Sequence, residues 1–221
     1  MYSLTVMAAH DYTRRAIDEL LSIDDIGMLS NGHSYADTVN LHKLVEGFLV
    51  EAVIKTYNQT PSAAMEGVFG EEGKDFSLSL NDGVVTIVMN VPVFRILSAR
   101  CSDSEHTLGE LIPENSAEGR KQLNKYIRGT YDDPRLVLLE KWNGDNMPRM
   151  KYYTTREEDV DDVTFDIEYL PYPELTEGYV LIAPQTKYAV LNNVVALVLD
   201  SYRETELADR FRNKSKELLE G

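Results

Sequence analysis

The segment at residues 67–74, GVFGEEGK, shares its Gly-Lys ending with phosphate-binding loops. Such a loop needs a Gly five residues before its last Gly and a Ser or Thr after the Lys, so that backbone amides surround a phosphate. Val68 and Asp75 occupy these two positions. A carboxylate at position 75 would repel phosphate. We therefore expect an ordinary loop here.

A run of carboxylates could bind a divalent cation. It consists of Glu157, Glu158, Asp159, Asp161 and Asp162, with Asp166 and Glu168 close behind. A calcium-binding loop alternates its oxygen ligands, turns sharply at a Gly and ends in a Glu. This run contains no Gly. It leaves two interpretations open, a solvated loop and a weak binding site for divalent cations.

The histidines and the cysteine form no ligand or nucleophile pattern. His10, His33, His42 and His106 show no i, i+4 pair of the kind that binds zinc on a helix, so we expect surface or capping positions. Cys101 has no second cysteine, which excludes a disulfide scaffold and disfavours a structural zinc site. We expect a structural thiol at Cys101, no metal, no cofactor and no enzyme.

Composition narrows the class further. The chain has 221 residues, 22 Lys and Arg against 37 Asp and Glu, a net charge of −15 and 43% hydrophobic residues. This hydrophobic content disfavours disorder, and the negative charge opposes tight binding to nucleic acid phosphates. The longest apolar run, residues 189–199, is too short to cross a membrane. The N-terminus lacks the basic-then-apolar order of a signal peptide, so we expect a cytoplasmic protein or one assembled there.

Apolar residues at helical spacing predict helices at both ends of the chain. The expected helices cover residues 8–21, a second stretch from Ser34 or Asp37 to residues 58–61, residues 185–202 and residues 205–219. The third is apolar around most of its circumference and should be buried on more than one side.

The middle of the chain has the alternating pattern of strands. Residues 76–80 and 84–89 flank an Asn-Asp-Gly turn, a strong hairpin signal because these residues tolerate positive φ. A second hairpin is expected from residues 136–142 and 149–154, a further strand at 163–170, and a short polar helix at 116–126.

These elements predict an α+β fold. We expect the N- and C-terminal helices to form a bundle with an inserted antiparallel β-rich region. The expected boundaries are 1–70 for the N-terminal helical part, 71–184 for the β-rich insert and 185–221 for the C-terminal helices that complete the bundle.

The order of several segments is more specific than any one of them. It runs through TRRAIDELL (13–21), VPVFRIL (91–97), QLNKYIRGTYDDP (122–134), KYY (151–153), FDIEYLPYP (165–173), LNNVVALVL (191–199) and LADRF (207–211). This order resembles the neck proteins of tailed bacteriophages, which are head–tail connectors also called adaptor or ring proteins, especially of crAss-like and short-tailed phages. In that family an acidic residue usually stands where this chain has Val93.

The resemblance implies a structural virion protein of the neck without catalytic activity. It implies a ring, commonly dodecameric, that links the portal protein to the tail and lines the passage for DNA during ejection, with no sequence-specific DNA binding and no membrane. We expect Leu207, Phe211 and Leu218 to contact a neighbouring subunit or the portal; in the alternative interpretation this stripe closes the chain's own core. We also expect the acidic run, residues 157–162, to face the channel. The alternative function is a small acidic cytosolic binding or regulatory module, for example a DNA mimic.

Overall fold

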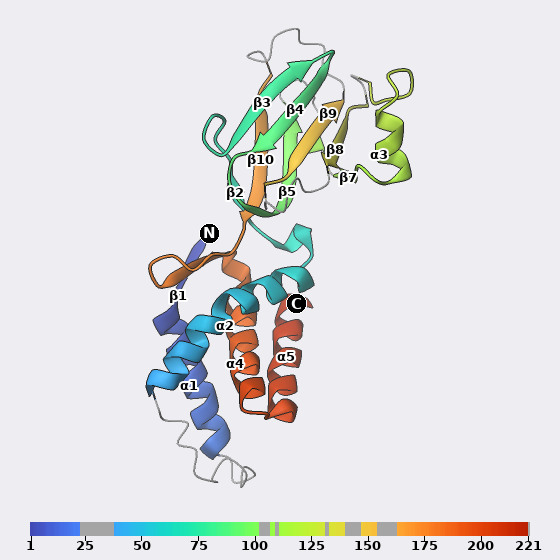
Figure 1. Cartoon of the computed structure of the whole chain (residues 1–221). Helices are drawn as coiled ribbons and strands as arrows, with labels where there is room; N and C mark the ends of the chain where they lie inside the picture. The colour runs from blue at the N-terminus through green and yellow to red at the C-terminus, as the bar shows by residue number, and fades with distance from the viewer. Residues whose placement is uncertain are drawn as a thin grey trace. The chain divides into compact units, whose positions relative to one another are not determined.

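A computed structural model describes residues 1–22, 38–101, 107–108, 111–130, 133–139, 147–153 and 163–220 (Figure 1). The fold is α+β, as the sequence predicts. The chain divides into two compact units. Met1–Glu66 and Pro173–Gly221 form the first, here called the helical unit, and Gly67–Tyr172 forms the second, the β unit.

The helical unit contains the four long helices expected from the sequence, and their existence is confirmed. Helix α4 contacts α1, α2 and α5. No helix among the described residues is both long and apolar enough to span a membrane. The elements of this unit are β1 (Tyr2–Thr5), α1 (Val6–Ser22), α2 (Thr38–Gln59), η1 (Ser62–Ala64), β11 (Tyr179–Ile182), η3 (Pro184–Thr186), α4 (Lys187–Ser201) and α5 (Thr205–Glu220).

Helix α4 lies at the centre of the helical unit, because every residue from 189 to 199 is buried. Its two buried asparagines bond to different neighbours. Asn193 donates to the Thr56 hydroxyl of α2 at 2.9 Å, and Asn192 accepts from the Tyr12 hydroxyl of α1 at 3.3 Å. Buried amides need such partners, and each partner fixes how a neighbouring helix packs on α4. The prediction that this helix is buried on several sides is confirmed.

Strands β1 and β11 form a two-stranded antiparallel sheet that the sequence did not indicate. Tyr2 lies opposite Ile182 and Thr5 opposite Tyr179. A tight turn with positive φ at Glu177 and Gly178 leads into β11. Because β11 pairs with the N-terminus, it belongs to the helical unit. The β unit therefore covers residues 67–172, which differs from the expected insert at residues 71–184.

The β unit contains two sheets. A four-stranded sheet has the order β2-β10-β5-β6, and a five-stranded sheet has the order β3-β4-β9-β8-β7. The elements are β2 (Val68–Phe69), β3 (Phe76–Asn81), β4 (Val84–Met89), β5 (Val93–Cys101), β6 (Thr107–Leu108), β7 (Ile112–Pro113), α3 (Ala117–Gln122), β8 (Arg135–Leu139), β9 (Arg149–Tyr153) and β10 (Phe165–Pro171).

The core of the β unit is built from the inner faces of both sheets. Tyr152 of the five-stranded sheet meets Phe165 of the four-stranded sheet edge to face, with ring centroids 5.3 Å apart. The strand pairs of both predicted hairpins are confirmed, and the first hairpin turns at Asp82 and Gly83, which both have positive φ. The turn of the second hairpin lies outside the described residues. The strands of this unit pair antiparallel, as expected, except that β7 pairs with β8 in parallel. Strand β7 lies just before α3 in the sequence. It has only two residues, which are too few to show the alternating pattern of a strand.

Candidate functional site

Helix α3 is fixed tightly to the edge of the five-stranded sheet. The Ser116 hydroxyl caps it by accepting the Gly119 N–H at 2.9 Å. A Cβ at Gly119 would lie 2.3 Å from the Pro113 carbonyl oxygen, so only glycine allows this approach. The helix ends at Gln122, and the expectation that it continues to residue 126 was wrong. The Asn124 side chain accepts the Tyr126 N–H at 3.0 Å, which favours a turn over further helix.

The turn after α3 is held by hydrogen bonds within its own backbone and by one buried side chain. The N–H groups of Ile127 and Arg128 both donate to the Asn124 carbonyl, at 3.0 and 2.9 Å. The Gln122 side chain, only 2% exposed, accepts the Gly129 N–H at 2.7 Å and closes the loop. The hydrogen bonds that hold the backbone of residues 122–129 therefore do not involve the side chains of Leu123, Tyr126 or Ile127.

Two contacts anchor this turn on the five-stranded sheet. A Cβ at Gly129 would lie 2.8 Å from the Tyr153 carbonyl oxygen of β9, so the backbones are in close contact. The Arg128 guanidinium donates to the Asp82 carbonyl at 2.9 Å, in the turn between β3 and β4. Burial raises the pKa of the Tyr153 phenol, and the nearby Arg128 charge partly offsets that rise. The turn thus contacts both β9 and the turn between β3 and β4.

The turn exposes three large apolar side chains in a segment that also carries four basic residues. Tyr126 is 84% exposed, Leu123 65% and Ile127 58%. The Lys125 ammonium lies 5.3 Å from the centroid of the Tyr126 ring, at cation–π distance. We call this set the α3-turn surface; its members are Leu123, Tyr126 and Ile127 with Arg120, Lys121, Lys125 and Arg128. Large apolar side chains clustered on ordered backbone are typical of protein contact sites.

Sequence reasoning missed this surface. The sequence predicts a short polar helix at residues 116–126, because polar and charged residues outnumber apolar ones there. The available signal was the presence of three large apolar residues, Leu123, Tyr126 and Ile127, within five positions of a segment rich in Lys and Arg.

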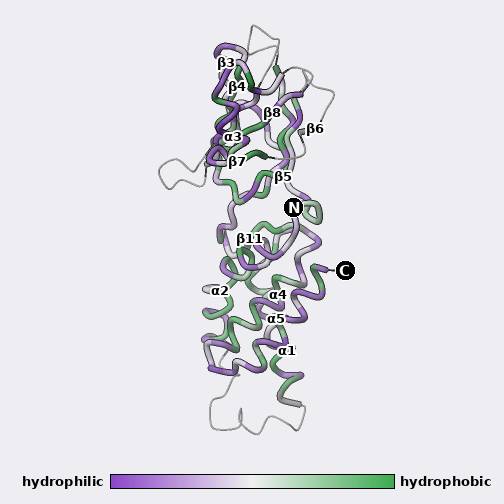
Figure 2. The backbone as a smooth tube through the Cα atoms, turned by 90° about the vertical axis from the view of Figure 1, so that its right-hand side faces the viewer, coloured by the Kyte–Doolittle hydropathy of each residue, from purple (hydrophilic) through white to green (hydrophobic). Residues whose placement is uncertain are grey.

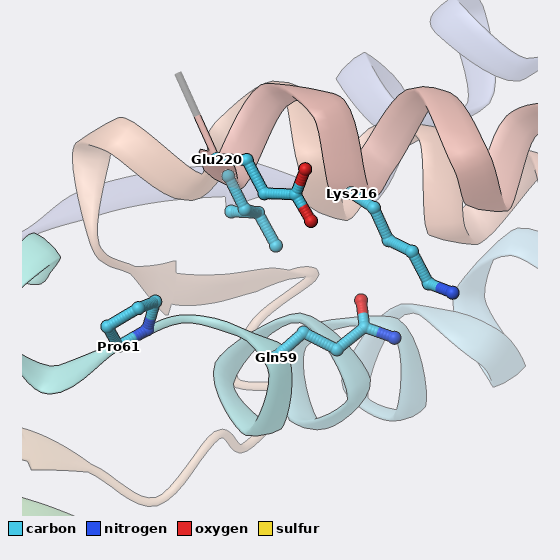
Figure 3. Close-up of a pocket in the computed structure, with 5 residues that line it drawn as sticks. Gln59, Pro61, Lys216 and Glu220 are labelled. Carbon is cyan, nitrogen blue, oxygen red and sulfur yellow. The ribbon is translucent and has the colours of Figure 1, made fainter.

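An open depression lies between α2 and α5 in the helical unit (Figure 3). Its volume is about 620 Å³. Lys216 and Glu220 stand on α5 opposite Gln59 and Pro61, which end and follow α2, and Leu219 completes the lining. All of these except Leu219 are exposed. Such a depression can receive a side chain of a partner, but its lining offers no buried polar group to activate a substrate.

The predicted interface residues of α5 do not share one exposed face. Leu207 and Phe211 are half-buried and pack against a cluster of the chain's own core. Leu218 is 47% exposed. Figure 2 shows hydrophobic and hydrophilic residues alternating along α5, as an amphipathic helix requires. Two of the three residues thus help to close the helical unit, which is the alternative that the sequence left open, and the subunit contact stays a prediction.

The acidic run lies outside the described residues, so its placement in a channel stays a prediction. Of its two neighbours, Asp166 is exposed on β10, whereas Glu168 is half-buried. Glu168 accepts the Gly67 N–H at 2.8 Å and the Ser98 hydroxyl at 3.4 Å. Glu168 therefore joins β10 to its two neighbours in the sheet.

The glycine-rich segment is an ordinary loop, as predicted. It connects β2 to β3 and no helix follows it. The Asp75 carboxylate accepts the Glu71 N–H at 3.0 Å, and Lys74 pairs with Glu71 at 3.3 Å. The Asp75 and Glu71 carboxylates thus already bind the backbone N–H and the Lys74 ammonium that would otherwise bind a phosphate.

Cys101 is fully buried in the core of the β unit, as a structural thiol should be. The surface position expected for His10 was wrong. His10 is 4% exposed, and its ring lies 5.7 Å from that of His42, centroid to centroid, because α1 and α2 pack together. His33 and His106 lie outside the described residues. Within the described part of the chain, no three His, Cys, Asp or Glu side chains gather as a metal site would require.

The chain matches no model of a protein family and no curated protein. Among the features of the described residues, the α3-turn surface says most about function, because it exposes three large apolar side chains.

Proposed function

We propose that this chain is a structural protein of the head–tail neck of a tailed bacteriophage, which assembles with copies of itself into a ring that joins the portal to the tail. The observation on which the proposal rests is the α3-turn surface. Leu123, Tyr126 and Ile127 remain exposed although hydrogen bonds order the backbone that presents them. A protein that works by assembly needs such surfaces, because apolar area buried between subunits drives association.

The order of the segments supports this particular assembly. It resembles the order in phage neck proteins, and both ends of the chain contribute to one helical unit, with the β unit between them in sequence. In the proposed ring the helices form a bundle and the β-rich region is the insert. The net charge of −15 suits a channel for DNA, because like charges keep the polymer from adhering to the wall. No chemical step and no cofactor are part of this function.

Co-assembly with the portal protein encoded in the same genome tests the proposal. Mass photometry of the mixed proteins should show the portal mass increased by a set number of 25.1 kDa subunits. The portal alone and the chain alone are the controls. Free monomers beside an unchanged portal would contradict the proposal.

The net charge of −15 also favours a second candidate, an acidic binding or regulatory module that imitates DNA. Such a module would displace DNA from a basic host protein, and it would leave the portal mass unchanged. A fluorescence competition assay with labelled duplex separates the two functions, because a neck protein has no reason to compete.

A further inference from the structure

We propose that the α3-turn surface is the contact through which one copy of this negatively charged chain binds a different surface of the next copy, in a head-to-tail arrangement. This inference rests on the proposed function, since it names the partner for that surface. All residues of the α3-turn surface lie within residues 120–128, a segment that contains four basic residues and no acidic residue.

Charge complementarity selects a second copy as the occupant. The chain has 15 more acidic than basic residues, so two copies repel each other over most of their surfaces. The α3-turn surface carries four positive charges, and Glu118 neutralises only that of Lys121, so its local charge is positive where that of the chain is negative. Contact between unlike surfaces of two identical chains is heterologous, and a heterologous contact generates rings when its rotation closes.

The chemistry of the surface fits a protein better than a nucleic acid. Leu123 and Ile127 offer nothing to a phosphate, whereas an apolar centre with Tyr and Arg is typical of protein interfaces. Nucleic acid interfaces are more polar and depend on several cations that reach phosphates. Two of the four cations here already have partners within the chain, since Lys121 pairs with Glu118 at 3.2 Å and Arg128 donates to Asp82.

The rigidity of the turn supports a contact role. Asn124 and Gln122 bond to the backbone of residues 126–129, so the exposed side chains lose little backbone entropy when a partner covers them. Tyr126 loses only two side-chain torsions on binding, which makes it an efficient anchor.

Photo-cross-linking tests the contact directly. Tyr126 is replaced by p-benzoyl-phenylalanine, and equal amounts of ¹⁵N-labelled and unlabelled chains are mixed with the portal protein before irradiation. We expect adducts in which one peptide is labelled and the other is not, both from this chain. Phe69→p-benzoyl-phenylalanine is the matched control, because Phe69 is also a large aromatic of the β unit and is 70% exposed. It should give no such adducts.

Self-association is then measured by sedimentation velocity in the presence and absence of 0.5 M salt. Tyr126→Ser should weaken association at least tenfold, because buried aromatic anchors dominate such contacts. Arg120→Glu should weaken it several-fold at low salt and less at high salt, where charges are screened. Lys74→Glu, which changes the net charge equally at an exposed loop, should leave association unchanged.

The outcomes separate this inference from the proposed function. If the chain joins the portal while position 126 cross-links only to the portal or to DNA, the head-to-tail contact is refuted and the neck function stands. If mixed-isotope adducts form while the portal mass stays unchanged, the contact stands and the neck function fails. Equal association of wild type and Tyr126→Ser would also overturn the contact.

Discussion

The buried phenol of Tyr57 predicts how the helical unit responds to alkali. Tyr57 is completely buried on α2, and its oxygen accepts the Ala183 N–H at 2.9 Å. Burial raises the pKa of Tyr57 to about 12, and the Ala183 hydrogen bond offsets only part of this effect. The substitution Tyr57→Phe removes both the ionisable group and the hydrogen-bond acceptor and leaves the ring in place.

The sign of the effect follows from the two pKa values of Tyr57. In the unfolded chain the phenol titrates near its ordinary value of 10.0, and in the folded chain near 12. Below pH 10 the neutral Tyr57 phenol contributes fully to the free energy of unfolding. This contribution is lost as the pH rises from the pKa of the unfolded chain to that of the folded chain, because the unfolded state releases the proton first. One pKa unit corresponds to about 1.36 kcal/mol, so wild type should lose roughly 1–2 kcal/mol from this group by pH 11.

Urea unfolding followed by circular dichroism at 222 nm measures this loss, since the long helices belong to the helical unit. At pH 8, Tyr57→Phe should be less stable than wild type by about 1–3 kcal/mol, because the Ala183 N–H loses its acceptor. At pH 11 the difference should shrink by roughly 1–2 kcal/mol. Tyr126→Phe, at an exposed tyrosine, should match wild type at both values. A difference between Tyr57→Phe and wild type that stays constant from pH 8 to pH 11 would refute the reasoning.

Three further substitutions test the packing and the predicted interface. Gly119→Ala should destabilise the β unit by about 1–3 kcal/mol in thermal unfolding followed by near-ultraviolet circular dichroism, because its Cβ would overlap the Pro113 carbonyl; an unchanged midpoint would contradict this. Asn193→Ala should cost about 1–3 kcal/mol in urea unfolding, because the buried bond to Thr56 is lost; a loss below the error of the measurement would count against it. Leu218→Asp should change the stability of the chain by no more than about 0.5 kcal/mol, since Leu218 is half exposed, yet reduce co-assembly with the portal in mass photometry if α5 contacts a subunit. Unchanged co-assembly would remove Leu218 from the interface.

The elements that could be predicted from the sequence have local causes. Helix α4 has apolar residues on all sides, which only a buried helix tolerates. The hairpin of β3 and β4 turns at Asp82 and Gly83, two residue types that adopt positive φ readily. In both cases the signal lies within the element itself, and its interpretation needs no knowledge of the rest of the fold.

The elements that could not be predicted depend on distant partners. Strand β1 has four residues, too few for a periodic pattern, and it is a strand because β11, more than 170 residues later, bonds to it. His10 is buried for a similar reason, because α2 brings His42 beside it. Sequence spacing cannot show such contacts, since the chain between the partners must first fold.

Helix α5 and the turn after α3 show why an apolar stripe alone does not identify an interface. On α5 the pattern that predicts a contact also predicts closure of the chain's own core, and Phe211 packs there. The buried Ser215 hydroxyl even donates to the Ala189 carbonyl of α4 at 3.0 Å, so this face of the helix is committed to its own unit. Tyr126 and its apolar neighbour Leu123 lie in a turn, and both stay exposed on a backbone that hydrogen bonds order. Exposure on ordered backbone therefore distinguishes a candidate contact surface from a helix face that completes a core.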